Sequence, residues 1–115
     1  MFTKITYLKN ATSYVEAEGK LDIYHAPDYL EEIKEHLNNI HPIEIVLDFS
    51  KINYVASIGL RTILELHKIM IHRKGRLKLK NVNDEIMQAF KFTGFDKFLT
   101  IENEPEKDVN TDIKP

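Results

Sequence analysis

The chain has 115 residues and a formal net charge of −2, with 43% hydrophobic and 30% charged residues. This composition is typical of one globular domain, which at this length buries roughly two thirds of its unfolded surface. The near-neutral charge argues against nucleic-acid binding, which usually needs a basic face. The chain contains no cysteine, which excludes disulfides, thiol catalysis and cysteine-ligated zinc. No stretch approaches the roughly 20 apolar residues of a membrane span, so we expect a cytoplasmic protein without a membrane partner.

The first third of the chain predicts a hairpin followed by a helix. Residues 4–9 alternate in polarity, residues 10–13 favour a turn, and residues 14–23 resume an extended pattern. Pro27 suits the start of a helix, and apolar residues then recur at spacings of three and four, which predicts a helix over 27–39. The recurring apolar residues are Tyr29, Leu30, Ile33, Leu37 and Ile40, the last of which directly follows the predicted helix.

The rest of the chain alternates between strands and helices. In order we expect a strand over 43–49, a helix from Ile58 to about Arg73, a strand over 76–82, a helix between its N-cap Asn83 and Gly94, and a strand over 98–102. This order predicts an α/β fold: one domain over residues 1–102, with helices packed on a mixed sheet built from the hairpin and right-handed β-α-β crossovers. Residues 103–115 are polar with two prolines, and we expect a flexible tail there.

Ser57 stands where the central strand gives way to a helix, without the usual companions of a catalytic serine. A G-x-S-x-G nucleophile elbow has a glycine two residues before its serine, and Val55 stands at that position before Ser57. The five histidines (His25, His36, His41, His67, His72) are scattered and the four glycines are isolated, which argues against a triad, a metal site and a phosphate-binding loop. The residues therefore predict no enzyme activity, no metal and no cofactor. Taken alone, Ser57 is expected to cap the helix, which stabilises it by about 1 kcal/mol.

The helix after Ser57 has apolar residues on two sides. At ~100° per residue, one narrow sector is predicted to face the core; it holds Leu60, Ile63, Leu64, His67 and Ile71. The side predicted to face away from the core holds Ile58, Thr62, Leu66 and Ile69. Two explanations stay open for this second stripe: a wide helix face covered by neighbouring elements, or a partner surface that begins beside Ser57.

Two sequence blocks, in the expected order of elements, resemble the bacterial anti-sigma factor antagonists of the STAS domain family, and the likeness extends from about Ile5 to Ile101. The first block, EGKLDIYHAPDYLEEI, matches the family pattern G-x-L/I-D…A…L through Gly19, Leu21, Asp22, Ala26 and Leu30. The second, VLDFSKINYVASIGLRTIL, matches D-L-S-x-V-x-Y-I-D-S-S/A-G-L through Asp48, Ser50, Tyr54, Ser57, Gly59 and Leu60. The chain departs from the common pattern at three positions: Ala56 replaces an aspartate, and Ile58 and Arg61 replace small residues.

The resemblance implies a regulatory binding protein. Ser57 corresponds to the serine that the partner anti-sigma factor, a serine kinase of histidine-kinase-like fold, phosphorylates in this family. The unmodified protein would bind that partner and release a sigma factor, phosphorylation would switch it off, and a serine phosphatase would reset it. The residues expected to contact the partner are Asp22, Ala56, Ser57, Ile58, Gly59, Arg61, Thr62 and Leu66, with Asp22 at the same edge of the sheet as Ser57. Two alternatives stay open: a non-phosphorylated STAS adaptor in a transport or stress-signalling complex, and a small anion- or nucleotide-binding domain that uses the Ser57 loop.

Overall fold

A five-stranded mixed sheet forms the framework of the protein. The computed structural model describes residues 2–103, and its elements in order are β1 (Phe2–Leu8), β2 (Thr12–Leu21), α1 (Ala26–Asn39), β3 (Glu44–Val55), α2 (Ser57–His72), β4 (Arg76–Lys80), α3 (Asp84–Thr93), the 3-10 helix η1 (Phe95–Lys97) and β5 (Thr100–Glu102). The strands lie in chain order across the sheet; β1 is antiparallel to β2, and every later pair is parallel. The predicted single α/β domain, with its hairpin and crossovers, is confirmed. Residues 104–115, most of the expected tail, lie outside the described residues, and the domain boundary at 102 stays a prediction.

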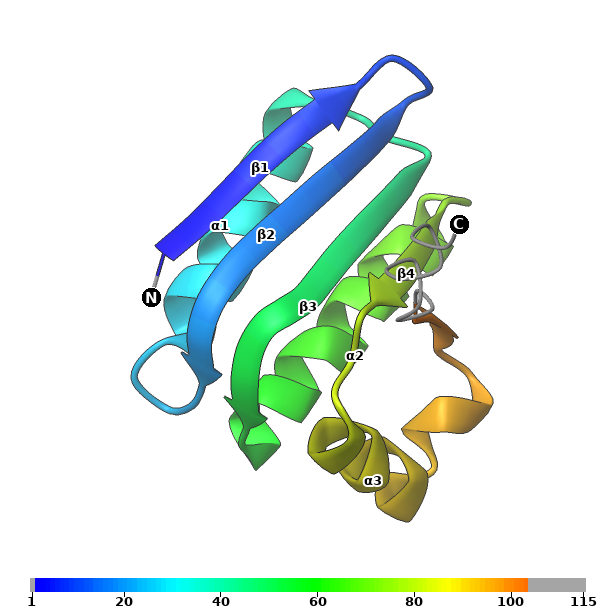
Figure 1. Cartoon of the computed structure of the whole chain (residues 1–115). Coiled ribbons are helices and arrows are strands. Elements are labelled where there is room, and N and C mark those ends of the chain that lie inside the picture. Colours follow the sequence, from blue (N-terminus) through cyan, green and yellow to red (C-terminus); the bar gives the residue numbers. More distant parts are fainter. Residues whose placement is uncertain (1, 104–115) are drawn as a thin grey trace, which may run out of the picture.

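One face of the sheet is covered and the other is largely open. Helices α1 and α2 pack against the same face of β2, β3 and β4, whereas no helix of residues 2–103 covers the opposite face of β1, β2 and β3 (Figure 1). The largest fully buried side chains come from both layers and include Leu21, Tyr29, Ile33, Leu47, Phe49, Ile63 and Leu66. No helix within residues 2–103 has the length and apolar character that a membrane crossing requires.

Local signals in the sequence place most of the element ends. The Asn83 side chain accepts a hydrogen bond from the Ile86 N–H at 2.8 Å, so the predicted N-cap of α3 is confirmed. The same helix ends at Gly94, whose φ of 84° lies in the left-handed region that glycine adopts without strain.

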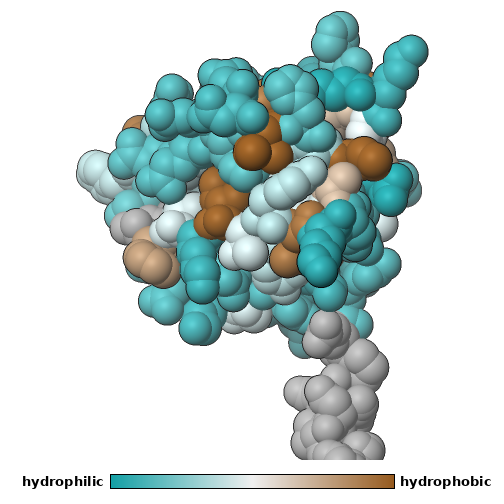
Figure 2. Space-filling view, turned by 90° about the horizontal axis from the view of Figure 1, so that it is seen from above, coloured by the Kyte–Doolittle hydropathy of each residue, from teal (hydrophilic) through white to brown (hydrophobic). Residues whose placement is uncertain are grey.

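The end at which β2 and β3 begin carries separate apolar side chains among hydrophilic ones, as on an ordinary protein surface (Figure 2).

Strand β3 runs six residues beyond its predicted end at Phe49. Pairing with β2 continues past a register shift between Glu16 and Glu18, where the two strands do not advance in step. Asp48 therefore lies within the strand, although the predicted strand over 43–49 placed it one residue from the strand's end. Its carboxylate accepts hydrogen bonds from the Tyr14 hydroxyl at 2.9 Å and the Ser50 N–H at 2.9 Å. Burial alone would raise the pKa of Asp48, but these hydrogen bonds outweigh it and lower that pKa below its usual value of 3.8.

Helix α2 begins in close contact with the ends of the two central strands. A Cβ built at Gly59 would lie 2.6 Å from the Leu21 carbonyl oxygen and 2.9 Å from Cγ1 of Val55. Such distances are well inside van der Waals contact, so only glycine permits the first turn of α2 to approach this closely. The contact fixes where α2 begins relative to β2 and β3.

We predict that Gly59→Ala destabilises the protein, although Gly→Ala in an exposed helix interior normally stabilises by about 1 kcal/mol. The added methyl group must displace backbone atoms, and such overpacking costs about 1–3 kcal/mol. Urea denaturation should show this loss, and Lys68→Ala, at an exposed position of the same helix, should stay within about 0.5 kcal/mol of the unmodified protein. Equal midpoints for the two variants would contradict the contact described for Gly59.

Candidate partner-binding site at the start of helix α2

The two central strands end side by side and bring Asp22 and Ser57 together. Leu21 and Val55 are register partners at the ends of the parallel strands β2 and β3. The Ala56 N–H donates a hydrogen bond to the Leu21 carbonyl at 3.0 Å, which joins the start of α2 to the end of β2. The residues that follow both strands, 22–25 and 56–58, therefore form one end of the sheet, at the bottom of Figure 1. We call it the Ser57 end. The expected placement of Asp22 on the same edge as Ser57 is confirmed.

Ser57 is the first residue of α2 and is exposed to solvent. The residue at the N-cap is Ala56, whose extended backbone (φ −85°, ψ 176°) precedes the helix and whose carbonyl accepts the Leu60 N–H at 3.0 Å. The prediction that Ser57 itself caps the helix is wrong by one position. Because alanine cannot cap with its side chain, the first turn of α2 keeps N–H groups available for an anion.

Asp22 organises the loop that precedes α1. One of its carboxylate oxygens accepts hydrogen bonds from the backbone N–H of Tyr24 (3.1 Å), the backbone N–H of His25 (3.1 Å) and the His25 ring at Nδ1 (2.8 Å). Desolvation would raise the pKa of Asp22, but the bonds from His25 and Tyr24 outweigh it and hold that pKa below its usual range. The carboxylate is therefore ionised at neutral pH and already engaged within its own loop.

This loop presents two apolar side chains that the sequence analysis did not single out. Ile23 is 66% exposed and Tyr24 is 81% exposed. On the neighbouring strand end Tyr54 is also exposed. The predicted extended segment 14–23 included Ile23, whereas β2 ends at Leu21. The available signal for the pair was two large apolar residues next to Asp22, between the end of the strand and the start of the helix. Large apolar side chains held out at one end of a domain often mark a contact with another protein.

The expectation that Thr62 and Leu66 face away from the core is wrong. The buried face of α2 consists of Gly59, Thr62, Ile63, Leu66 and Met70, so the stripe is part of the covered helix face. The physical reason is that small Gly59 brings the helix close to the strands and turns Thr62 inward. Ile71, expected in the core, is exposed, whereas Leu60, Leu64 and His67 are partly buried.

The eight residues expected to contact a partner therefore fall into two groups. Gly59, Thr62 and Leu66 are buried, and they place the helix. Five residues can be reached from solvent; Ser57 and Arg61 are exposed, and Asp22, Ala56 and Ile58 are partly exposed. These five lie around the Ser57 end, and their role in binding stays a prediction.

Comparison with known proteins shows the family. The family model described as the STAS domain matches residues 5–107. The chain belongs to the STAS domain family. The anti-sigma-B factor antagonist of Bacillus subtilis (strain 168) is 26% identical over 95 residues, which cover 83% of this chain and 85% of the relative.

Two solved structures of SpoIIAA share the fold. The anti-sigma factor antagonist SpoIIAA in its unphosphorylated form superposes with a TM-score of 0.78 at 16% sequence identity, covering 97% of this chain and 96% of the other. The Bacillus cell fate determinant SpoIIAA in its phosphorylated form superposes with a TM-score of 0.71, also at 16% identity, covering 98% and 100%. At this identity the superpositions establish the fold.

We predict that Leu66→Asp unfolds the protein, because it places a carboxylate where a fully buried leucine packs. Loss of a buried leucine side chain alone costs about 2–5 kcal/mol, and an unpaired buried charge adds to that. Arg61→Asp, an exposed position on the same helix, is the matched control and should leave the thermal midpoint within a few degrees. Circular dichroism melting compares the two. A folded Leu66→Asp protein with a normal midpoint would mean that this side of α2 faces solvent.

Proposed function

We propose that this STAS protein is an anti-sigma factor antagonist that binds its anti-sigma factor through the Ser57 end. The observation that carries the proposal is an exposed serine at the first position of α2, beside a loop that holds Ile23 and Tyr24 in solvent. The kinship to an anti-sigma-B factor antagonist over most of both chains supports the class of partner. Binding would occupy the anti-sigma factor and thereby release a sigma factor.

The partner surface combines apolar contact with a site for charge. Tyr24 and Ile58 supply apolar area, and Arg61 supplies a positive charge at the rim. Asp22 acts through its loop, since its carboxylate hydrogen-bonds the Tyr24 N–H and thus sets how the loop is presented. Interfaces of this kind depend most on a few large side chains near their centre, for which Tyr24 is the best candidate.

In this proposal the anti-sigma factor is also a serine kinase, and Ser57 is its substrate. The hydroxyl is exposed, and the protein itself can accept a phosphate there. N–H groups of the first helical turn and the positive end of the helix dipole favour an anion at this position. Phosphorylation would therefore leave the fold intact, and a serine phosphatase acting on the exposed group would reverse it.

Across the interface the same phosphate is unfavourable. It carries a charge of about −1.5 to −2. Against one acidic partner group at ~6 Å, with an effective dielectric constant of ~40–80, the repulsion amounts to roughly 1–3 kcal/mol. That corresponds to about a five- to hundredfold loss of affinity. The protein thus acts as a switchable binding partner and performs no chemistry of its own.

We predict a ranked series of affinities for the anti-sigma factor, measured by isothermal titration calorimetry. Ser57→Ala should bind at least as tightly as the unmodified protein, because it removes the phosphate acceptor and no contact. Ser57→Asp should bind roughly tenfold more weakly, since it adds one charge on a shorter arm. Phosphoserine should bind most weakly. Because Ser57 is not the N-cap, the Ala variant should also lose no more than about 0.5 kcal/mol of stability.

The salt dependence of the affinity identifies the cause of weaker binding by Ser57→Asp. At 1 M salt the Debye length shrinks to ~3 Å, so affinity lost through repulsion should partly return in Ser57→Asp. Equal binding by the Ala and Asp variants would remove the charge switch and favour an adaptor that is never phosphorylated. The small-ligand alternative would be favoured if no variant binds an anti-sigma factor and the protein binds a phosphate or a nucleotide instead.

A further inference from the structure

Strand β1 forms one border of the sheet, and its outer side lacks a partner strand within residues 2–103. In an antiparallel pair, alternate residues of a strand turn their N–H and C=O groups toward the neighbour, and the residues between turn them away. Half of the backbone hydrogen-bonding groups of β1 therefore point outward from the sheet. Such a row is a template for one more strand.

Proteins usually protect an edge strand from pairing with another chain, and β1 has few of the features that give this protection. Its register against β2 runs without a shift from Phe2 opposite Glu18 to Leu8 opposite Thr12, so no bulge turns it away. It contains no proline, and Lys4 is its one charged residue. The edge strand β1 thus offers seven residues in regular register that can pair with a further strand.

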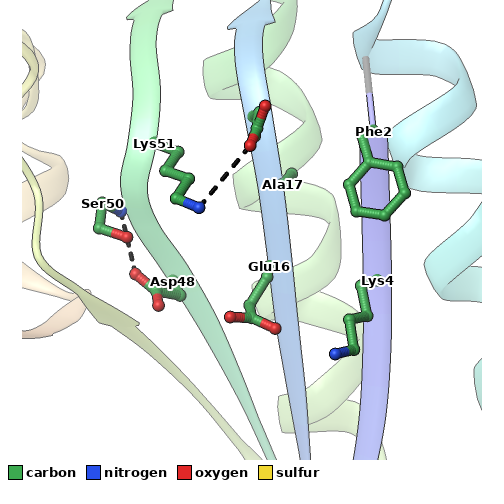
Figure 3. Close-up of a pocket in the computed structure, with 8 residues that line it drawn as sticks. Phe2, Lys4, Glu16, Ala17, Asp48, Ser50 and Lys51 are labelled. Atoms are coloured by element: carbon green, nitrogen blue, oxygen red, sulfur yellow. Dashed lines mark hydrogen bonds and ion pairs between the residues drawn. The ribbon is translucent and has the colours of Figure 1, made fainter.

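The border is also apolar where a surface strand would be polar. Phe2 is 64% exposed, Tyr7 48% and Leu8 41%. Phe2 points to the open face of the sheet, on the side where Lys4 also lies (Figure 3). Large side chains at both ends of one short strand favour a partner that covers both ends at once.

We propose that β1 pairs antiparallel with β1 of a second copy, about a two-fold axis at Ile5. In this register Phe2 lies opposite Leu8 of the second copy, and Lys4 lies opposite Thr6. On the other face Thr3 lies opposite Tyr7, and Ile5 meets Ile5. Each exposed apolar end is thereby covered by the other copy, as a self-complementary two-fold interface requires.

Neighbouring registers are worse for identifiable reasons. An axis at Lys4 would set Lys4 directly against Lys4 of the other copy, which is unfavourable for like charges. An axis at Thr6 would set Leu8 against Lys4 and separate Phe2 from Leu8. Only the Ile5 axis pairs all seven residues of β1. Within each copy Glu16 is the register partner of Lys4 and moderates the diagonal contact between the two lysines.

The dimer contact uses no residue of the proposed partner site. The Ser57 end is formed by the residues after β2 and β3, and these lie beyond the N-terminal end of β1 and not along its outer edge. Antiparallel pairing turns the second copy end over end, so the two Ser57 ends would face opposite directions. The pairing concerns β1 alone and holds or fails independently of the proposed function.

Two substitutions at the exposed Thr6 provide a matched test by sedimentation velocity over micromolar to millimolar protein concentration. Thr6→Glu places a carboxylate opposite Lys4 of the second copy, and the two resulting pairs should lower the dimer dissociation constant roughly two- to thirtyfold. Thr6→Lys places a lysine opposite Lys4 of the second copy, and this repulsion should raise the dimer dissociation constant by a similar factor. The matched control is Thr100, exposed on the border strand β5, where Glu and Lys variants should leave the constant unchanged.

Circular dichroism of each variant checks that the monomer is folded, since both changes are at an exposed position. High salt should bring the Glu and Lys constants closer together. The proposal is overturned if the unmodified protein and Thr6→Glu sediment as monomers throughout the range. It is likewise overturned if the two Thr6 variants dimerise equally well at low salt, because association would then use another surface.

Discussion

The hydrogen bond from the Ala56 N–H to the Leu21 carbonyl, together with the close approach of Gly59 to the same carbonyl, positions the candidate partner-binding site of this protein. These contacts tie the first turn of α2 to the ends of both central strands. Once the helix is held there, Thr62 and Leu66 must turn into the core, and Ser57 must lie outside it. The exposed serine is thus a consequence of backbone packing next to it, and a charge added to it meets solvent and not the core.

The sequence predicted the order of elements and the sheet correctly because these depend on local signals. Asn83 and Gly94 are examples, since each acts on the backbone within a few residues of itself. Which side of α2 is buried could not be predicted in this way. A helical projection gives weight to large apolar residues, whereas the contact here is made by Gly59, whose lack of a side chain matters only once Leu21 is known to be beside it. The length of β3 was missed for a related reason, because its second half is held by pairing with a distant strand.

The candidate site was predicted in outline and corrected in detail. Asp22 and Ser57 were placed at one end of the sheet, which follows from parallel strands ending together. The cap was misassigned because a helix start is hard to place within one residue from sequence. Tyr24 was not singled out because the feature that marks it is its exposure to solvent, which a sequence does not display. The resulting surface is an ordered loop and a helix start on a packed core. Under the proposed function, this arrangement would let a partner sense one added charge without any rearrangement of the fold.

Hydrogen–deuterium exchange of the unmodified and Ser57-phosphorylated proteins, each with and without the anti-sigma factor, tests this account most directly. The free proteins should show equal protection in β2, β3 and α2, since the phosphate touches no buried group. On addition of the partner, residues 22–25 and the first turn of α2 should gain protection in the unmodified protein, and the phosphorylated protein should gain little. Protection of a different surface by the partner, or loss of protection along α2 caused by the phosphate alone, would contradict the account.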